Sequence, residues 1–178
     1  MAAGAGTPSP HGAGPRPLVI GLGSRGRHDD ALGLDAVDRL EPRLQGAGEV
    51  ARCSSEGTEL LDLWDGRPRV VVVDAVRSGA VPGTIFRLAV DDLPVPPPFR
   101  SSSTHGISIA DVVALARSLD RLPRTLVIYG IEGERFEPGI GLSARISPAV
   151  DRVVEEILEE IAGDSRDDAR SPEARSHA

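Results

Sequence analysis

The run RVVVVDAV, residues 69–76, constrains the fold of this chain more than any other segment. Its four consecutive valines leave no alternation between an apolar and a polar face, so a strand made of them must be buried on both sides. Strands of this kind belong to parallel sheets that are covered by helices. The segment therefore predicts the centre of an α/β sheet, with Asp74 at the point where the strand leaves the core.

Shorter apolar or β-branched runs predict the rest of the sheet. Four more strands are expected, at residues 17–21, 50–54, 84–90 and 125–132, and the run 84–90 suits a position nearer an edge. Apolar residues at helical spacing separate these strands, and strands that alternate with helices form a sheet covered on both faces. The expected fold class is α/β: a three-layer sandwich with a twisted, mostly parallel five-stranded sheet and helices on both faces.

Capping signals set the expected helix boundaries. Thr58 precedes the apolar run ELLDLW, and Ser108 with Asp111 forms an S-x-x-D capping box. Ser147 fits the N-cap of a final helix, which we expect to end at Gly163.

The two ends of the chain differ in composition from its middle. Residues 1–16 are rich in Gly, Ala and Pro, and residues 164–178 are polar with mixed charge. Neither end can bury enough apolar surface to offset the entropy lost on ordering. We expect a disordered N-terminal arm over 1–16, a single α/β domain over 17–163 and a disordered tail over 164–178. The length of 178 residues suits one domain.

Charge and cysteine content limit the possible partners and cellular location of the protein. The net charge of −7 argues against a nucleic-acid surface or an anionic membrane as partner. No apolar run approaches the roughly 20 residues that span a bilayer, and the N-terminus lacks the features of a signal peptide. The single cysteine, Cys53, rules out an internal disulfide and a cysteine metal cage. We therefore expect a cytoplasmic protein.

A glycine-rich loop follows the first expected strand. Gly21, Gly23 and Gly26 spell G-x-G-x-x-G, which in the right βαβ unit binds a dinucleotide. Here the helical pattern begins only after Asp30, not at the glycines, and the expected position of a ribose-binding acid falls before the second strand. A phosphate would also meet two carboxylates, Asp29 and Asp30. A nucleotide-binding oxidoreductase remains an alternative that these features disfavour.

Three ligand-type side chains are expected at one edge of the sheet. Asp30 opens the first helix, Asp74 ends the valine strand, and His105 lies in a polar loop before the capped helix. Ligands of open α/β sheets gather beyond the carboxyl ends of the strands, and carboxylates with an imidazole suit a divalent transition metal. Each residue also has an ordinary structural explanation: helix capping for Asp30, a turn for Asp74 and solvent exposure for His105.

No nucleophile for covalent catalysis is evident. Cys53 lies in an expected strand without a histidine beside it in the sequence, which favours a buried structural thiol. No G-x-S-x-G motif is present.

Taken in order, four blocks of the chain resemble a known family. The blocks are GLGS…DDALG (21–33), VVVVDAV…VPGT (70–84), SSTHGISIADVV (102–113) and LVIYGIEGERFEPGIGLS (126–143). They are similar to the motifs of the nickel–iron hydrogenase maturation endopeptidases, and four blocks in order are much more specific than any one. The resemblance covers roughly residues 18–161 and marks the domain over 17–163 as a protease domain.

The resemblance implies an enzyme and its substrate. The family's members remove a C-terminal peptide from a hydrogenase large-subunit precursor after nickel has been installed, so no tightly bound cofactor is expected and the nickel belongs to the substrate. Asp30, Asp74 and His105 take the metal-ligand positions, with Asp30 and Asp74 as the catalytic carboxylates and Asp29 in support. Nickel, cadmium or zinc is expected to occupy such a site in vitro, and we expect a monomer.

Two positions depart from the family's pattern. Ser24 stands where Asn is usual. In the loop CSSEGT (53–58) the family often has an acid two residues before Gly-Thr, where this chain has Ser55, so any role of that acid passes to Glu56 or is absent. The alternative to an enzyme is a non-catalytic, metal-sensing maturation chaperone that uses the same three ligands.

Overall fold

A five-stranded, mostly parallel sheet forms the centre of the molecule. The computed structural model describes residues 16–54, 58–89 and 108–168. The strand order is β2-β1-β3-β5-β4, and only β4 runs antiparallel to its neighbour. The strands are β1 (Leu18–Leu22), β2 (Glu49–Cys53), β3 (Arg69–Val76), β4 (Ile85–Ala89) and β5 (Thr125–Glu132). All five lie within a residue or two of the predicted runs, and β4 is at an edge as predicted.

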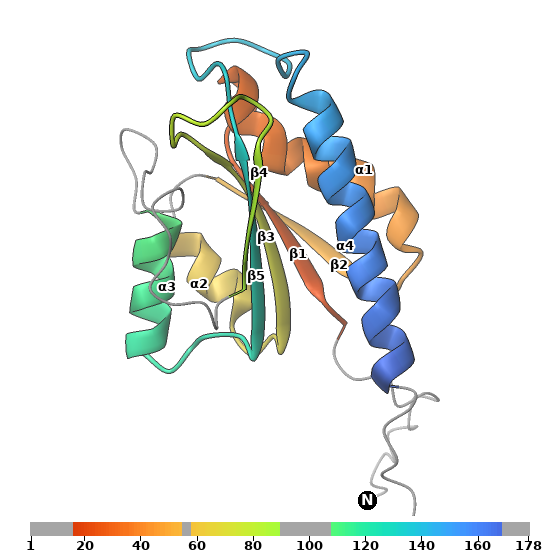
Figure 1. Cartoon of the computed structure of the whole chain (residues 1–178). Coiled ribbons are helices and arrows are strands. Elements are labelled where there is room, and N and C mark those ends of the chain that lie inside the picture. Colours follow the sequence, from red (N-terminus) through yellow and green to blue (C-terminus); the bar gives the residue numbers. More distant parts are fainter. Residues whose placement is uncertain (1–15, 55–57, 90–107, 169–178) are drawn as a thin grey trace, which may run out of the picture.

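Helices cover both faces of this sheet (Figure 1). The helices α1 (Leu32–Leu44) and α4 (Ser147–Asp168) lie on one face, and the helices α2 (Thr58–Trp64) and α3 (Ile109–Ser118) lie on the other. The three-layer α/β sandwich is therefore confirmed. No helix in the described part of the chain is long and apolar enough to cross a membrane.

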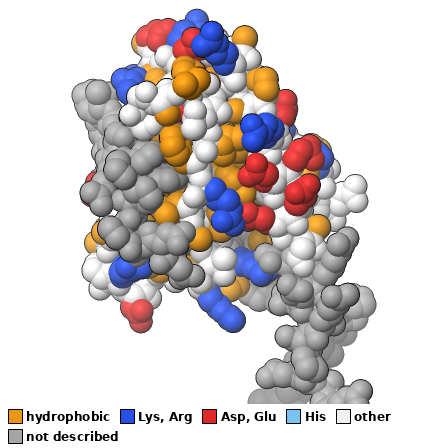
Figure 2. Space-filling view, in the orientation of Figure 1, with side chains coloured by type: hydrophobic (Ala, Val, Ile, Leu, Met, Phe, Trp, Pro, Cys, Tyr) orange, Lys and Arg blue, Asp and Glu red, His pale blue; other side chains and the backbone are white. Residues whose placement is uncertain are grey.

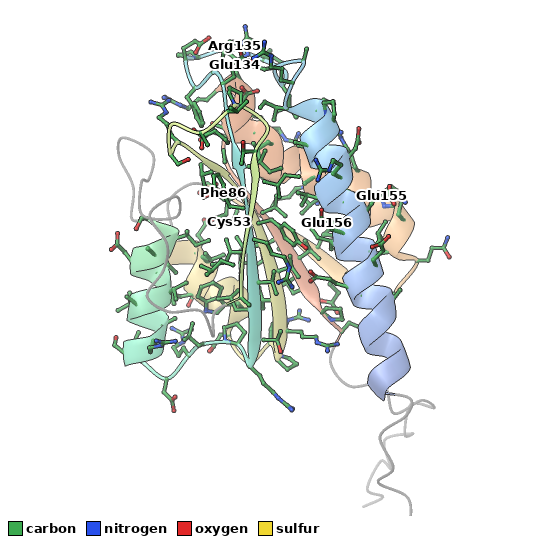
Figure 3. The ribbon with its side chains drawn as sticks, in the orientation of Figure 1. Cys53, Phe86, Glu134, Arg135, Glu155 and Glu156 are labelled. Carbon is green, nitrogen blue, oxygen red and sulfur yellow. The ribbon has the colours of Figure 1, made fainter. Side chains whose placement is uncertain are left out.

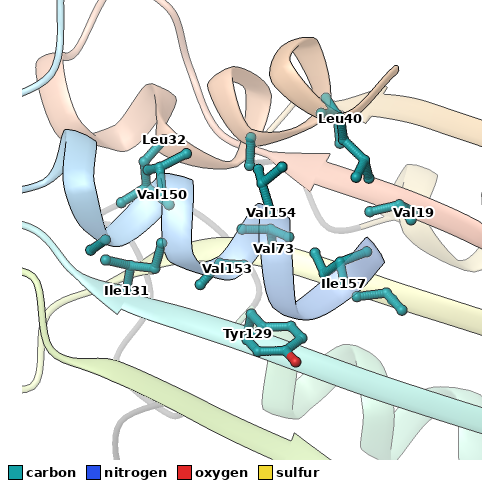
Figure 4. Packing of buried hydrophobic residues seen from close by; sticks show 14 of the residues in the cluster. Val19, Leu32, Leu40, Val73, Tyr129, Ile131, Val150, Val153, Val154 and Ile157 are labelled. Carbon is teal, nitrogen blue, oxygen red and sulfur yellow. The ribbon is translucent and has the colours of Figure 1, made fainter. Parts of the chain in front are cut away.

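The valine run of β3 contributes to both core layers, as its sequence predicts. Val71 and Val73 pack in the layer beneath α1 and α4, whereas Val70 and Val72 pack beneath α2 and α3. Figure 4 shows the first of these layers, where Tyr129 lies under α4. Burial of each such side chain contributes about 1.5–3 kcal/mol, so the two layers supply most of the driving force for the fold.

The first helix begins where the sequence predicts, and the last helix ends later than predicted. A 3-10 turn (His28–Ala31) precedes α1, so the helix starts after Asp30 as predicted, and the acids lie in that turn. The predicted end of the final helix at Gly163 is wrong, because α4 continues to Asp168. Glycine inside a helix costs only about 1 kcal/mol relative to alanine, and no proline follows at once to stop the helix. The expected disordered tail over 164–178 thus begins inside a helix.

Candidate functional site

Loops at the carboxyl ends of β1, β3 and β5 form the candidate site. The parallel strands place these ends along one edge of the sheet, and the 3-10 turn after β1 contacts β3 there. Figure 3 shows Glu134 and Arg135, in the loop after β5, at this end of the molecule. The capping box of Ser108 with Asp111, predicted from the sequence, opens α3.

Asp30 in the 3-10 turn and Asp74 in β3 lie close enough at this edge for their charges to interact. Burial and the nearby charge of Asp30 raise the pKa of Asp74 to about 7, although Ala75 N–H donates to its carboxylate at 2.8 Å. Asp30 is only 9% exposed, and burial raises its pKa as well. Two carboxyl groups that repel each other in a desolvated position favour a shared proton or a cation. The structure thus brings together two of the three predicted ligands.

Positive charge and a backbone donor partly offset the effect of burial on the pKa of Asp30. The arginines Arg27 and Arg77 act to lower its pKa, and so does a hydrogen bond from the backbone N–H of Ser24. Ser24 N–H also lies 3.3 Å from the backbone oxygen of Asp30. Because the backbone makes these contacts, serine in place of the family's asparagine leaves them intact.

The third predicted ligand lies outside the described residues. His105 and Glu56 both fall in segments that the structure does not describe. Among the residues that it does describe, no group of three His, Cys, Asp or Glu side chains is placed to hold a metal ion. The complete ligand set of Asp30, Asp74 and His105 therefore stays a prediction.

Asp29 holds the loop that follows β5. Its side chain is fully buried, and its carboxylate accepts hydrogen bonds from the backbone N–H groups of Glu134, Arg135 and Ser143 at 2.6–2.9 Å. The hydroxyl of Ser143 donates a fourth at 2.8 Å. Burial acts to raise the pKa of Asp29, but these hydrogen bonds outweigh it and lower the pKa below its ordinary value. Asp29 is thus an anchor for residues 133–143, in keeping with a supporting role.

His28 fixes the far part of the same loop. Its backbone N–H donates to Gly139 O at 3.1 Å, and Gly139 N–H donates to Gly26 O at 2.9 Å. The imidazole Nδ1 lies 3.1 Å from Gly141 O, and the ring covers Gly139 so closely that a Cβ there would be 1.9 Å from Nε2. The sequence pattern did not single out His28, because its partners lie more than 100 residues away.

Glu132 is a second buried anchor, and it was not predicted from the sequence. It is 3% exposed at the end of β5, opposite Val76, and it accepts hydrogen bonds from the backbone N–H of Ser78 and of Gly79 and from the hydroxyl of Ser78. A single acid at the end of an otherwise apolar strand was the available signal. Its effect is to fix the turn between β3 and β4.

Cys53 is a structural thiol, as predicted. It is 1% exposed in the core layer beneath α2 and α3, and burial followed by the charge of Glu59 raises its pKa to about 12. A thiol with that pKa stays protonated at neutral pH and is a poor nucleophile. Figure 3 shows Cys53 in the interior, well below the loops of the edge.

The glycine-rich loop serves the packing of α1. A Cβ on Gly21 would lie 2.1 Å from Gly33 O, and a Cβ on Gly23 would lie 1.7 Å from Asp30 O. A side chain at either glycine would push the helix or the 3-10 turn off the sheet. Gly26, the third glycine of the motif, has open space around it. At the first two glycines the space beside the backbone is filled by carbonyl groups of the protein itself and not left open for a pyrophosphate. This argues against a dinucleotide site.

Comparisons with known proteins agree with this architecture. A family model described as hydrogenase maturation protease matches residues 37–160. The chain is 34% identical over 146 residues to the hydrogenase 2 maturation protease of Escherichia coli, covering 78% of this chain and 88% of that protein. It is 33% identical over 142 residues to a putative hydrogenase maturation protease of Methanocaldococcus jannaschii, covering 76% and 90%.

A solved structure leads to the same family. The hydrogenase maturating endopeptidase HybD of E. coli superimposes with a TM-score of 0.72 at 30% identity, covering 84% of this chain and 93% of that one. The fold, the site and these matches define an α/β endopeptidase, a hydrolase with no evident covalent nucleophile among the residues that the structure describes. The chain belongs to the hydrogenase maturation protease family.

Proposed function

We propose that this endopeptidase removes a C-terminal peptide from the nickel-loaded precursor of a hydrogenase large subunit, acting as a monomer in the cytoplasm. The observation that carries the proposal is the pair of carboxyl groups at the carboxyl edge of the sheet, the buried Asp30 and the half-buried Asp74, whose charges interact. The family supplies the reaction class, and the carboxyl pair supplies a place for a substrate-borne cation.

The carboxyl pair is suited to a cation that arrives with the substrate. Without a cation, burial and mutual repulsion favour a proton on Asp74 at neutral pH. A divalent ion stabilises both charged forms and displaces that proton, so binding of the nickel leaves two carboxylates facing it. His105 completes the proposed ligand set, and zinc or cadmium would occupy the same position in vitro.

The peptide bond is then broken by water. The proposed contact with nickel places the scissile bond beside the carboxylates, which orient a water molecule and accept its proton. The water oxygen bonds to the carbonyl carbon, the carbon–nitrogen bond breaks, and the proton passes to the leaving amine. The arginines near Asp30 favour its charged form while it acts.

Intact-mass analysis of a large-subunit precursor tests the proposal. We expect the nickel-loaded precursor to lose a C-terminal peptide and the nickel-free precursor to stay whole. Asp74→Asn and His105→Ala should each lower the cleavage rate at least about 100-fold, the scale of one catalytic group. Asp62→Asn is the matched control, since Asp62 is an exposed acid of α2 that pairs only with Arg121 among the described residues.

Two outcomes would contradict the proposal. Normal cleavage by Asp74→Asn or His105→Ala would show that the ligand assignment is wrong. A shift in the mobility of the precursor without any loss of mass would favour the metal-sensing chaperone over the protease.

A further inference from the structure

Two loops at the carboxyl edge contact each other and form one surface. Residues 77–84 connect β3 to β4, and residues 133–143 follow β5. The guanidinium of Arg77 lies 4.2 Å from the ring centroid of Phe136, which joins the two segments. We call residues 77–84 and 133–143 the loop pair. Figure 2 shows acidic, basic and apolar side chains intermixed at this end of the molecule.

A buried carboxylate anchors each member of the loop pair. Glu132 accepts hydrogen bonds at 2.7–3.0 Å from residues 78 and 79. Asp29 accepts four at 2.6–2.9 Å from residues 134, 135 and 143. Hydrogen bonds to a charged, buried acceptor contribute more than those between neutral groups, so both loops have defined positions before any partner arrives.

The loop pair presents the most exposed apolar side chains of the described residues. Four large apolar side chains are exposed among the described residues, and the two most exposed, Ile140 at 90% and Val81 at 72%, both lie in the loop pair. Single exposed aliphatic residues are ordinary on protein surfaces. These two differ because their backbones are fixed: Gly139 and Gly141 on either side of Ile140 are held by His28, and Thr84 donates from its N–H and its hydroxyl to Val81 O.

The loop pair lies beside the carboxyl pair. Arg77 is close enough to Asp30 to lower its pKa, and His28, which holds residues 139 and 141, is two residues from Asp30. From the 3.1 Å bond between His28 N and Gly139 O and the roughly 3.8 Å spacing of Cα atoms, the Cα atoms of Ile140 and Asp30 are within about 19 Å. A standard protein interface of about 800 Å² per partner spans roughly 30 Å. A folded partner that reaches Asp30 can therefore cover Ile140 too.

We infer that the loop pair docks the folded body of the large-subunit precursor, with Val81 and Ile140 as apolar anchors that enter pockets on the precursor. The inference rests on the proposed function, because that function supplies a protein-sized substrate at Asp30 and Asp74. Rigid presentation lowers the entropy lost on binding, which is what preformed anchors contribute to an interface. Docking by these loops is independent of the nickel.

Binding of the nickel-free precursor isolates this contribution, because the proposed function leaves that precursor uncut. The Kd of the full chain for the nickel-free precursor is measured by biolayer interferometry. The double variant Val81→Ser/Ile140→Ser should raise the Kd roughly tenfold, the effect of losing one or two central contacts. The variant Ile140→Leu, which keeps an apolar side chain, should bind like the wild type.

Leu115 in α3 and Leu119 directly after it provide the matched control. Leu115→Ser/Leu119→Ser removes two side chains that are 42% and 51% exposed on another surface, and it should leave the Kd unchanged. An unchanged Kd for the loop-pair variant, an equal loss in the α3 variant, or no binding of the nickel-free precursor by wild type would overturn the inference. So would a wild-type dimer that the loop-pair variant converts to monomer, because a second copy would then be the occupant. Failure of the proposed function is read separately, from the mass of the nickel-loaded precursor.

Discussion

Asp29 and Asp30 are adjacent in the chain yet have opposite electrostatic environments. Hydrogen bonds from the loop after β5 lower the pKa of Asp29 despite its burial, whereas burial raises the pKa of Asp30 because fewer donors reach it. The first residue stabilises the fold as a charged group. Asp30 and the neighbouring Asp74 have raised pKa values, so a nearby cation would stabilise their charged forms.

Replacing Asp74 should therefore raise stability where the wild type has to ionise it. The pKa of Asp74 is about 7 in the folded chain and about 3.8 in an unfolded one, so the folded state binds the proton more tightly and stability falls as pH rises between these values. We expect Asp74→Asn to increase the free energy of unfolding by about 1–3 kcal/mol at pH 8. Urea unfolding at pH 8 and near pH 4 checks this, because the gain in the free energy of unfolding should be present at pH 8 and vanish near pH 4. A loss of stability at pH 8 would contradict the assignment.

Residue positions were predictable where the chain itself marks them. Asp30 stands just before a recognisable helix start and Asp74 directly follows the valine run of β3, so both could be expected at the same edge. Glu132 and His28 act through Ser78, Gly79 and residues 139–141, which only the folded chain brings near. Their roles depend on contacts across more than 50 positions of sequence, and no local pattern encodes such contacts.

At the scale of elements, the packing of α1 on β1 depends on two facing glycines. Gly21 in the strand and Gly33 in the helix bring the backbones so close that neither position has room for a methyl group. The approach places the 3-10 turn, and with it Asp30, over the ends of β1 and β3. The spacing of the first element pair is thus part of the site.

The glycine motif can be tested with a matched pair of variants. Gly21→Ala should lower the free energy of unfolding by about 3 kcal/mol, because its Cβ would lie 2.1 Å from Gly33 O and the helix must move. Gly26→Ala has open space and a compatible backbone, so it should cause no loss and a gain of at most about 1 kcal/mol. Thermal melting of both variants measures this. Equal losses would show that the motif serves something other than helix packing.

The elements themselves were largely predictable, and their ends were less so. Long apolar or capped segments, such as the run of β3 and the helix opened by Ser108, follow from burial patterns and local hydrogen bonds. The end of α4 does not, because continuing or stopping at Gly163 differs by only about 1 kcal/mol. The direction of β4 was likewise open, since its side-chain pattern fits either orientation at an edge.

For the whole molecule, acidic groups act on stability in two opposite directions. Asp29 and Asp38 have lowered pKa values, since hydrogen bonds and nearby arginines outweigh burial, and they stabilise the fold as charged groups. Asp30 and Asp74 have raised pKa values and oppose folding when they ionise. We therefore expect the chain to be most stable at a pH where Asp30 and Asp74 are still partly protonated.

The pH profile of wild-type unfolding should show this balance. Carboxyl groups whose pKa is lowered by folding, such as Asp29 and Asp38, stabilise the fold above their unfolded pKa. They lose this contribution as pH falls through the folded pKa, so stability should fall below about pH 4. Carboxyl groups whose pKa is raised by folding, Asp30 and Asp74, destabilise the fold as they ionise. The free energy of unfolding should therefore also decline toward pH 8, with its maximum between about pH 4 and 7. Urea unfolding across this range measures the profile. Stability that rises steadily to pH 8 would contradict it.

The chain has one tryptophan and one tyrosine, and they are buried on opposite faces of the sheet. Trp64 lies in the layer beneath α2 and α3, and Tyr129 lies in the layer beneath α1 and α4. Each half of the interior thus carries one of these two residues. Because indole alone can be excited at the long-wavelength end of its absorption, tryptophan fluorescence follows the layer beneath α2 and α3 without a label or an added reporter residue.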